Sequence, residues 1–152
     1  MLVVTYNHVA TNMLLKDPRV DFDLNETSGF IYACGRGNIE IVKTLLQDKR
    51  IDPSYGNNHA IKLACGNGRT EAVELLLKDP RVDPTVDNYA LKQSCSGGYT
   101  EVVKLLLKDP RIDPSVEDNY AYNIATKKGH QKIVELLLQD KKVAALVNKD
   151  SS

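Results

Sequence analysis

The chain has 152 residues, of which 42% are hydrophobic and 26% charged, an ordinary balance for a folded domain. Lys+Arg and Asp+Glu both number 20, so the formal net charge is zero, which argues against a general binder of nucleic acid or of anionic membranes. No apolar run approaches the roughly 20 residues of a membrane helix, and the N-terminus carries no basic leader, so we expect a cytoplasmic or nuclear protein without a membrane anchor.

The sequence repeats itself every 30 or 31 residues. One marker is the aspartate that closes each Leu-Leu-(Lys/Gln)-Asp unit, with steps of 31, 31, 30 and 31 residues. These aspartates are Asp17, Asp48, Asp79, Asp109 and Asp140. A second marker keeps the same register at Gly37, Gly68, Gly98 and Gly129. Two markers in one register predict a stack of short helical units.

In chain order, the register divides residues 1–152 into one domain built from repeats. A half-repeat with only a second-type helix is predicted as a cap over residues 5–17. Full repeats follow at about residues 18–48, 49–79, 80–109 and 110–140, and a helical extension covers residues 141–152. The predicted fold class is all-α: a helical repeat solenoid of four helix pairs with an N-terminal half-repeat cap.

The repeat at residues 80–109 illustrates how the sequence predicts a finger and two helices. Two prolines in residues 79–84 prevent a continuous helix and predict a turn or short finger. A first helix is expected over residues 89–97, with Asn88 as its N-cap and Gly98 as its C-terminal stop. A second helix is expected from about residue 100 to residue 108, where the apolar residues follow the i, i+3, i+4 spacing of one buried stripe.

Particular motifs resemble those of a known family. The segment Leu63-Ala64-Cys65-Gly66-Asn67-Gly68 precedes Glu71-Ala72-Val73-Glu74-Leu75-Leu76-Leu77, and Gly129-His130 precedes Val134-Glu135-Leu136-Leu137. On these motifs, roughly residues 14–140 resemble the ankyrin-repeat family. The resemblance implies a right-angled stack of paired antiparallel helices with fingers on one side. It also implies protein–protein recognition through the fingers and the concave face of the first helices.

The chain departs from the pattern of that family in two ways. Its repeats are shorter than the usual period of about 33 residues, so tighter fingers are expected. The Thr-Pro-Leu-His stretch is absent, and the corresponding segments begin at Ser28, His59, Tyr89 and Tyr120. We expect Asn58, Asn88 and Asn119 to cap the first helices instead.

Nothing in the sequence points to catalysis, a cofactor or a metal. Cys34, Cys65 and Cys95 share one register, and stacked helices about 8–10 Å apart hold such residues too far apart for a disulfide or a zinc site. We interpret them as buried, reduced packing residues, with a redox-sensitive thiol as the alternative. His59 begins a predicted helix, and His130 has the position that the family gives to a structural histidine. The Asp-Pro fingers lack the ligand density of a calcium loop.

Positions that differ between repeats are the candidates for binding a partner, because framework positions must agree for the units to stack. The candidate partner-binding residues are Glu26, Arg36, Tyr55, Asn57, Asn67, Arg69, Asp87, Tyr89, Ser96, Tyr99, Glu117, Asp118, Tyr120, Lys127 and Lys128. They form two rows, one mostly acidic at the finger ends and one partly basic at the first-helix ends. Alternatively, the charges serve helix ends and the tyrosines only pack against one another.

The favoured function is a non-catalytic interaction module or adaptor that binds another protein, and we expect the chain itself to be a monomer. A second class is a structural protein that self-associates through an end of the stack, for example through residues 1–4. The near-identical segments 76–84 and 106–114 would also suit an engineered repeat scaffold. One weak point is expected in the third repeat, where Gln93 and Ser94 interrupt the apolar pattern of the first helix.

Overall fold

The computed structural model describes residues 24–150, and the side chains of residues 28–149 within them. The half-repeat cap predicted for residues 5–17 and the segment 1–4 lie outside the described residues. The described elements are α2 (Leu24–Arg36), α3 (Ile39–Leu46), α4 (Tyr55–Gly66), α5 (Thr70–Leu77), η1 (Val86–Asn88), α6 (Tyr89–Gly97), α7 (Thr100–Lys108), α8 (Val116–Lys128), α9 (Gln131–Leu137) and α10 (Lys141–Asp150). No strand occurs in residues 24–150, so the all-α prediction is confirmed.

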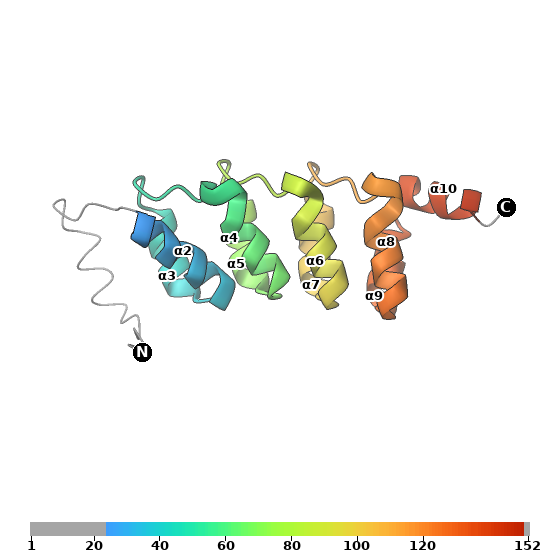
Figure 1. The fold of residues 1–152 in the computed structure, drawn as a ribbon, viewed down its shortest axis with the longest axis horizontal. Helices are drawn as coiled ribbons and strands as arrows, with labels where there is room; N and C mark the ends of the chain where they lie inside the picture. Colours follow the sequence, from blue (N-terminus) through green and yellow to red (C-terminus); the bar gives the residue numbers. More distant parts are fainter. Residues whose placement is uncertain (1–23, 151–152) are drawn as a thin grey trace.

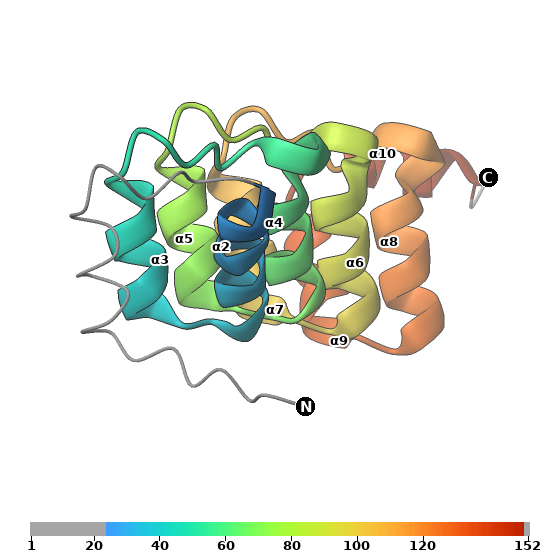
Figure 2. The same cartoon turned by 60° about the vertical axis from the view of Figure 1, so that its left-hand side comes forward.

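The helices form two layers (Figure 1). The first helices of the repeats, α2, α4, α6 and α8, stand side by side in chain order. The second helices, α3, α5, α7 and α9, make the layer behind them, as the turned view shows (Figure 2). The finger loops lie along one edge of the stack, and α10 continues beyond α8 at the C-terminal end. The predicted solenoid of four helix pairs is therefore confirmed.

The core is built from the same positions in successive repeats. Each second helix buries two adjacent residues and a third one turn later, at Ile41, Val42 and Leu45, then Ala72, Val73 and Leu76, then Val102, Val103 and Leu106, then Ile133, Val134 and Leu137. Helices of seven to nine residues, such as α5, α7 and α9, are marginal in isolation, so they depend on this shared burial. The cysteines belong to the same core, because Cys34, Cys65 and Cys95 are all free and buried.

The turn between the helices of each pair follows the sequence prediction. Gly98 ends α6 with a φ of 74°, in the left-handed region that favours glycine, and Gly129 ends α8 in the same way. The second helix of that third repeat covers Thr100–Lys108, as expected. The predicted helical extension is α10, whose Val143 is fully buried.

The three asparagines do not act as predicted. Asn88 is the N-cap residue of α6, but its side chain makes no capping hydrogen bond. Asn58 and Asn119 lie inside α4 and α8, so the prediction that they are caps is wrong. All three have left-handed backbone conformations, with φ values of 59° for Asn58, 50° for Asn88 and 58° for Asn119. Their side chains bond elsewhere. Asn58 Oδ1 accepts a hydrogen bond of 2.8 Å from the amide of Asp83 in the next finger, and Asn119 Nδ2 donates to the carbonyl of Val143 at 3.2 Å. They therefore join neighbouring repeats rather than cap their own helix.

The polar pair in the third repeat is accommodated in two different ways. Ser94 is fully buried, and its hydroxyl donates to the carbonyl of Ala90 at 2.8 Å. Gln93 is only half-buried and lies against Gly66 of the preceding repeat. The buried polar group is thus satisfied within α6.

Candidate functional site

The exposed tyrosines of the described residues all lie on the first helices. The exposed fractions are 50% for Tyr32, 40% for Tyr55, 40% for Tyr89 and 43% for Tyr120. They come from α2, α4, α6 and α8 in turn, so each first helix carries one exposed aromatic ring. Tyr89 and Tyr120 occupy the same position in successive repeats. We call these four residues the tyrosine row.

A lysine of the preceding repeat covers the ring of Tyr89. Lys62 Nζ lies 5.8 Å from the centre of that ring and 2.8 Å from Asp87 Oδ2. Asn57 Nδ2 also reaches Asp87 Oδ2, at 3.3 Å. The residues Asn57, Asp87 and Tyr89, predicted separately from the sequence, are thus brought together by Lys62, which the sequence analysis did not select.

The same unit recurs one repeat later. Lys92 Nζ lies 5.2 Å from the ring centre of Tyr120 and 2.6 Å from Glu117 Oε2. Asn88 Nδ2 donates to Glu117 Oε1 at 3.1 Å. Hydrogen bonds from Lys92 and Asn88 lower the pKa of Glu117. Tyr89 and Tyr120 therefore each lie against a lysine of the preceding repeat.

The second row of candidates, at the ends of the first helices, also joins repeats. Asn67 Nδ2 and Arg69 Nε donate to the carbonyl of Gly35 at 3.0 Å and 3.1 Å. This carbonyl lies at the C-terminal end of α2, where backbone oxygens lack a partner within the helix. In the fourth repeat His130 Nε2 lies 3.1 Å from the carbonyl of Ser96. The structural role predicted for His130 is thus explained as a contact to the preceding repeat.

Tyr99 occupies the corresponding position in the third repeat. Its ring packs so closely on Gly68 and Gly97 that a Cβ at either glycine would lie 2.5 Å or 2.3 Å from a ring atom. Tyr99 is half-buried in this contact. Its surface is therefore largely used within the stack.

Several candidates stay open to solvent. Arg36 is exposed, donating from Nε to the Tyr32 hydroxyl at 2.9 Å, with its guanidinium carbon 5.2 Å from the ring centre. Tyr55, Asp118, Lys127 and Lys128 are exposed too. Within residues 28–149, the side chains of these last four residues form no hydrogen bond or ion pair. Glu26 lies on α2, but its side chain is outside the described set.

The described residues hold no arrangement that suggests bond chemistry. Among them, no group of three or more His, Cys, Asp or Glu side chains could hold a metal ion. Burial raises the pKa of the Cys34, Cys65 and Cys95 thiols to about 12, which removes the thiolate that a nucleophile or metal ligand requires. His59 is exposed at the start of α4. None of the helices described is long and apolar enough to cross a membrane.

Comparison with protein families agrees with this geometry. A family model for ankyrin repeats (three copies) matches residues 1–88 and 82–150. The chain belongs to the ankyrin-repeat family. Ankyrin repeats are generally protein–protein interaction modules and are typically non-catalytic. A comparison with curated protein sequences finds no match.

Two asparagines form contacts at the place where this chain departs from the usual ankyrin-repeat sequence. Asn58 and Asn119 reach the next finger or the terminal helix with their amide groups, at a junction where the chain lacks the Thr-Pro-Leu-His segment. In this chain, asparagine side chains therefore link neighbouring repeats by hydrogen bonds to backbone groups 24 or 25 residues away.

Proposed function

We propose that this ankyrin-repeat protein binds another protein through the tyrosine row and the exposed ends of its first helices. The observation that supports the proposal most strongly is that α2, α4, α6 and α8 each carry one exposed tyrosine. Tyrosine offers a large, rigid contact area at a low cost in conformational entropy, and it is enriched among the residues that dominate binding energy.

The charges of the face support a specific division of roles. Asp87 and Glu117 are each held by a lysine of the preceding repeat, so they stabilise the face more than they offer free negative charge. Lys127 and Lys128 at the end of α8 are exposed. We propose that these lysines and Arg36 supply the polar rim around the aromatic row, with a monomeric protein presenting the whole face.

A second candidate function is structural, with the chain self-associating through an end of the stack. Support for it comes from Leu138, the large exposed aliphatic side chain on the second-helix side among the described residues. An engineered repeat scaffold also stays open, on the near-identity of segments 76–84 and 106–114. Sedimentation at increasing concentration separates self-association from binding, because a simple binder keeps the mass of a monomer.

Affinity capture with matched variants tests the favoured function. The face variant carries Tyr89→Ala, Tyr120→Ala and Lys128→Ala, and the control carries Lys43→Ala, Lys78→Ala and Lys132→Ala, which are exposed on or beside the second helices. The expected result is that proteins captured by the wild type and by the control are lost with the face variant. Thermal unfolding of both variants establishes that each is folded. Equal capture by all three proteins would overturn the proposal.

A further inference from the structure

An arginine links each of the inner fingers to the finger before it. Arg81 Nη1 donates to the carbonyl of Ile51 at 3.0 Å, and Arg111 Nη1 donates to the carbonyl of Val82 at 2.8 Å. The other nitrogens of Arg111 hold its own finger, with Nε and Nη2 at 2.9 Å and 2.6 Å from the carboxylate of Asp109. The guanidinium group therefore fills the space between one aspartate and one backbone carbonyl.

The carbonyl that the arginine bonds belongs to a buried apolar residue at both junctions. Ile51 and Val82 are 0% and 1% exposed. Asp79 binds Arg81 with the same pair of contacts, at 2.9 Å and 2.6 Å. Two successive junctions thus repeat one arrangement: a guanidinium group bound by a carboxylate and by the carbonyl of a buried apolar residue.

The last junction keeps the aspartate but not the arginine. Asp140 takes the position of Asp109, and its Oδ1 accepts from the amide of Lys142 at 2.8 Å, as Asp109 Oδ1 does from the amide of Arg111 at 3.0 Å. Lys142 takes the position of the arginine, but it directs its ammonium to Asp113 Oδ2 at 2.5 Å. The guanidinium position between Asp140 and the preceding finger is therefore not filled by the chain itself.

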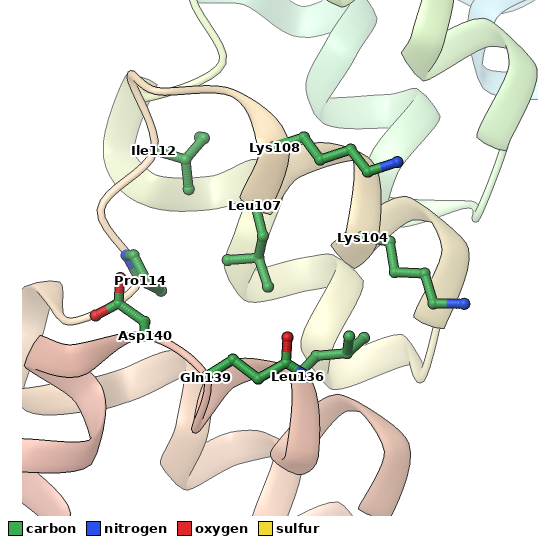
Figure 3. Close-up of a pocket in the computed structure, with 8 residues that line it drawn as sticks. All are labelled: Lys104, Leu107, Lys108, Ile112, Pro114, Leu136, Gln139 and Asp140. Carbon is green, nitrogen blue, oxygen red and sulfur yellow. The ribbon is translucent and has the colours of Figure 1, made fainter.

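A pocket of about 340 Å³ lies at this position (Figure 3). Asp140 and Pro114 stand together at one end, while Leu107, Leu136 and Ile112 give it apolar walls. Ile112 is partly exposed here, unlike its counterparts Ile51 and Val82. The pocket thus contains a carboxylate like those that bind Arg81 and Arg111 at the two preceding junctions, together with an apolar floor.

We propose that this pocket is a docking site for an arginine side chain of a protein partner. Its carboxylate matches the planar fork of a guanidinium group, and its floor matches the apolar flank of that group. The two inner junctions supply the template for the ligand, since the same chain positions there enclose an arginine. The site lies between α7, α9 and the preceding finger, on the second-helix side, so it is independent of the tyrosine row.

The lysines beside the pocket are compatible with a cationic ligand. Lys104 and Lys108 extend away from Asp140, towards the other end of the pocket (Figure 3). Lys104 pairs with Glu101 at 2.6 Å. Lys108 has the chain position of Lys78, at the junction where Arg111 is bound. A lysine at this position therefore coexists with a guanidinium group one repeat earlier.

The test is a titration of the isotope-labelled full chain, followed by the backbone amide signals of Ile112 and Asp140. N-acetyl-arginine amide, N-acetyl-lysine amide and free L-arginine are each added up to about 50 mM, since one anchored side chain gives weak affinity. We expect saturable shifts with the blocked arginine and at least about tenfold weaker binding of the blocked lysine. Equal binding of the two, or no saturation with the blocked arginine, would overturn the proposal. Preference for free L-arginine over the blocked form would also overturn it, in favour of a small-molecule site.

Two matched variants test whether the blocked arginine binds at Asp140. Asp140→Asn removes the carboxylate charge but keeps a good N-cap residue for α10, and we expect it to weaken binding of the blocked arginine at least about tenfold. Asp118→Asn makes the same change in charge at an exposed residue of α8 and should leave binding unchanged. Equal effects of the two variants would overturn the proposal. Wild-type self-association that Asp140→Asn abolishes would overturn it in a different way, by showing a second copy of the chain as the occupant.

Discussion

Arg111 and Val82, 29 residues apart, are joined by a hydrogen bond of 2.8 Å from the guanidinium Nη1 to the backbone carbonyl. Since the same guanidinium group also holds Asp109, the arginine fixes the shape of one finger and its distance from the preceding finger. The arginines therefore give the short fingers a common register that turn residues alone would not provide.

The first prediction is that Arg111→Lys lowers the free energy of unfolding by about 1 kcal/mol, although the charge is kept. A lysine presents a single ammonium group and cannot span Asp109 and the carbonyl of Val82 together. The estimate is reduced because the Arg111 side chain is 39% exposed. Urea unfolding followed by far-UV circular dichroism measures the change.

Arg36→Lys is the control for this change, because Arg36 bonds to Tyr32 one turn away on its own helix and not to a backbone carbonyl of another finger within residues 28–149. We expect it to alter the free energy of unfolding by less than about 0.5 kcal/mol. If Arg111→Lys is as mild as Arg36→Lys, the finger arginines do not couple the repeats.

The second prediction concerns the stability of the fold at low pH. Hydrogen bonds from Lys142 and then from Ser115 lower the pKa of Asp113 to about 2. Since the pKa is lower in the folded state than in the unfolded state, this carboxylate stabilises the fold above about pH 4, and the contribution is lost as the pH falls towards 2. We expect Lys142→Met to raise the pKa of Asp113 towards its ordinary value. Carbon-detected NMR of the carboxyl group measures it directly, and an unchanged titration would show that Lys142 is not the cause.

The third prediction is that the three cysteines of the native protein resist alkylation and disulfide exchange. Burial raises the pKa of the Cys34, Cys65 and Cys95 thiols to about 12, so very little thiolate forms at pH 8. A thiol reagent should react with them only after urea unfolds the chain. Lys128→Cys, which adds an exposed thiol, is the positive control. Rapid reaction of the native wild-type protein would contradict the assignment as packing residues.

The fourth prediction concerns Gln93, which is half-buried against Gly66 while Leu63 and Ile124 hold the same position in neighbouring repeats. Gln93→Leu should raise the free energy of unfolding by about 1 kcal/mol, because apolar area replaces an amide group that forms no hydrogen bond within residues 28–149. Gln93→Ala, which removes contact area, should lower it. The same urea unfolding assay decides, and no change with either variant would place the side chain in solvent.

The sequence was sufficient to predict the helix pairs because their signals are local. Gly98 ends α6 and residues 100–108 form α7, as the glycine marker and the apolar spacing indicated. A repeat register also predicts which apolar positions share the core. The repeat register does not indicate which polar residue of a neighbouring repeat a given side chain will bind.

The candidate site shows this limit most clearly. Asp87 and Glu117 were predicted as partner-binding residues of an acidic row, and in the structure each is bound by a lysine 25 residues earlier. The signal that could have identified these lysines is their own register, since Lys62 and Lys92 are 30 residues apart and each follows a helix start by a few residues. Whether the remaining exposed surface binds a partner stays a prediction, because exposure alone does not distinguish used from unused surface.

The left-handed turn within the first part of α8 leads to the last prediction. Asp118 has a φ of 52° and a ψ of 49°, a backbone conformation that costs an L-residue roughly 1–2 kcal/mol. Asp118→Gly removes the strain, whereas Asp118→Ala keeps it and loses the tolerance that short polar side chains have for this region. We therefore expect the glycine variant to exceed the alanine variant by about 1 kcal/mol in free energy of unfolding. The gap should be smaller than the full strain, because glycine also loses more conformational freedom on folding. Equal stability of the two variants in urea would mean that the turn is right-handed in solution, and the asparagine contacts between repeats would then need another geometry.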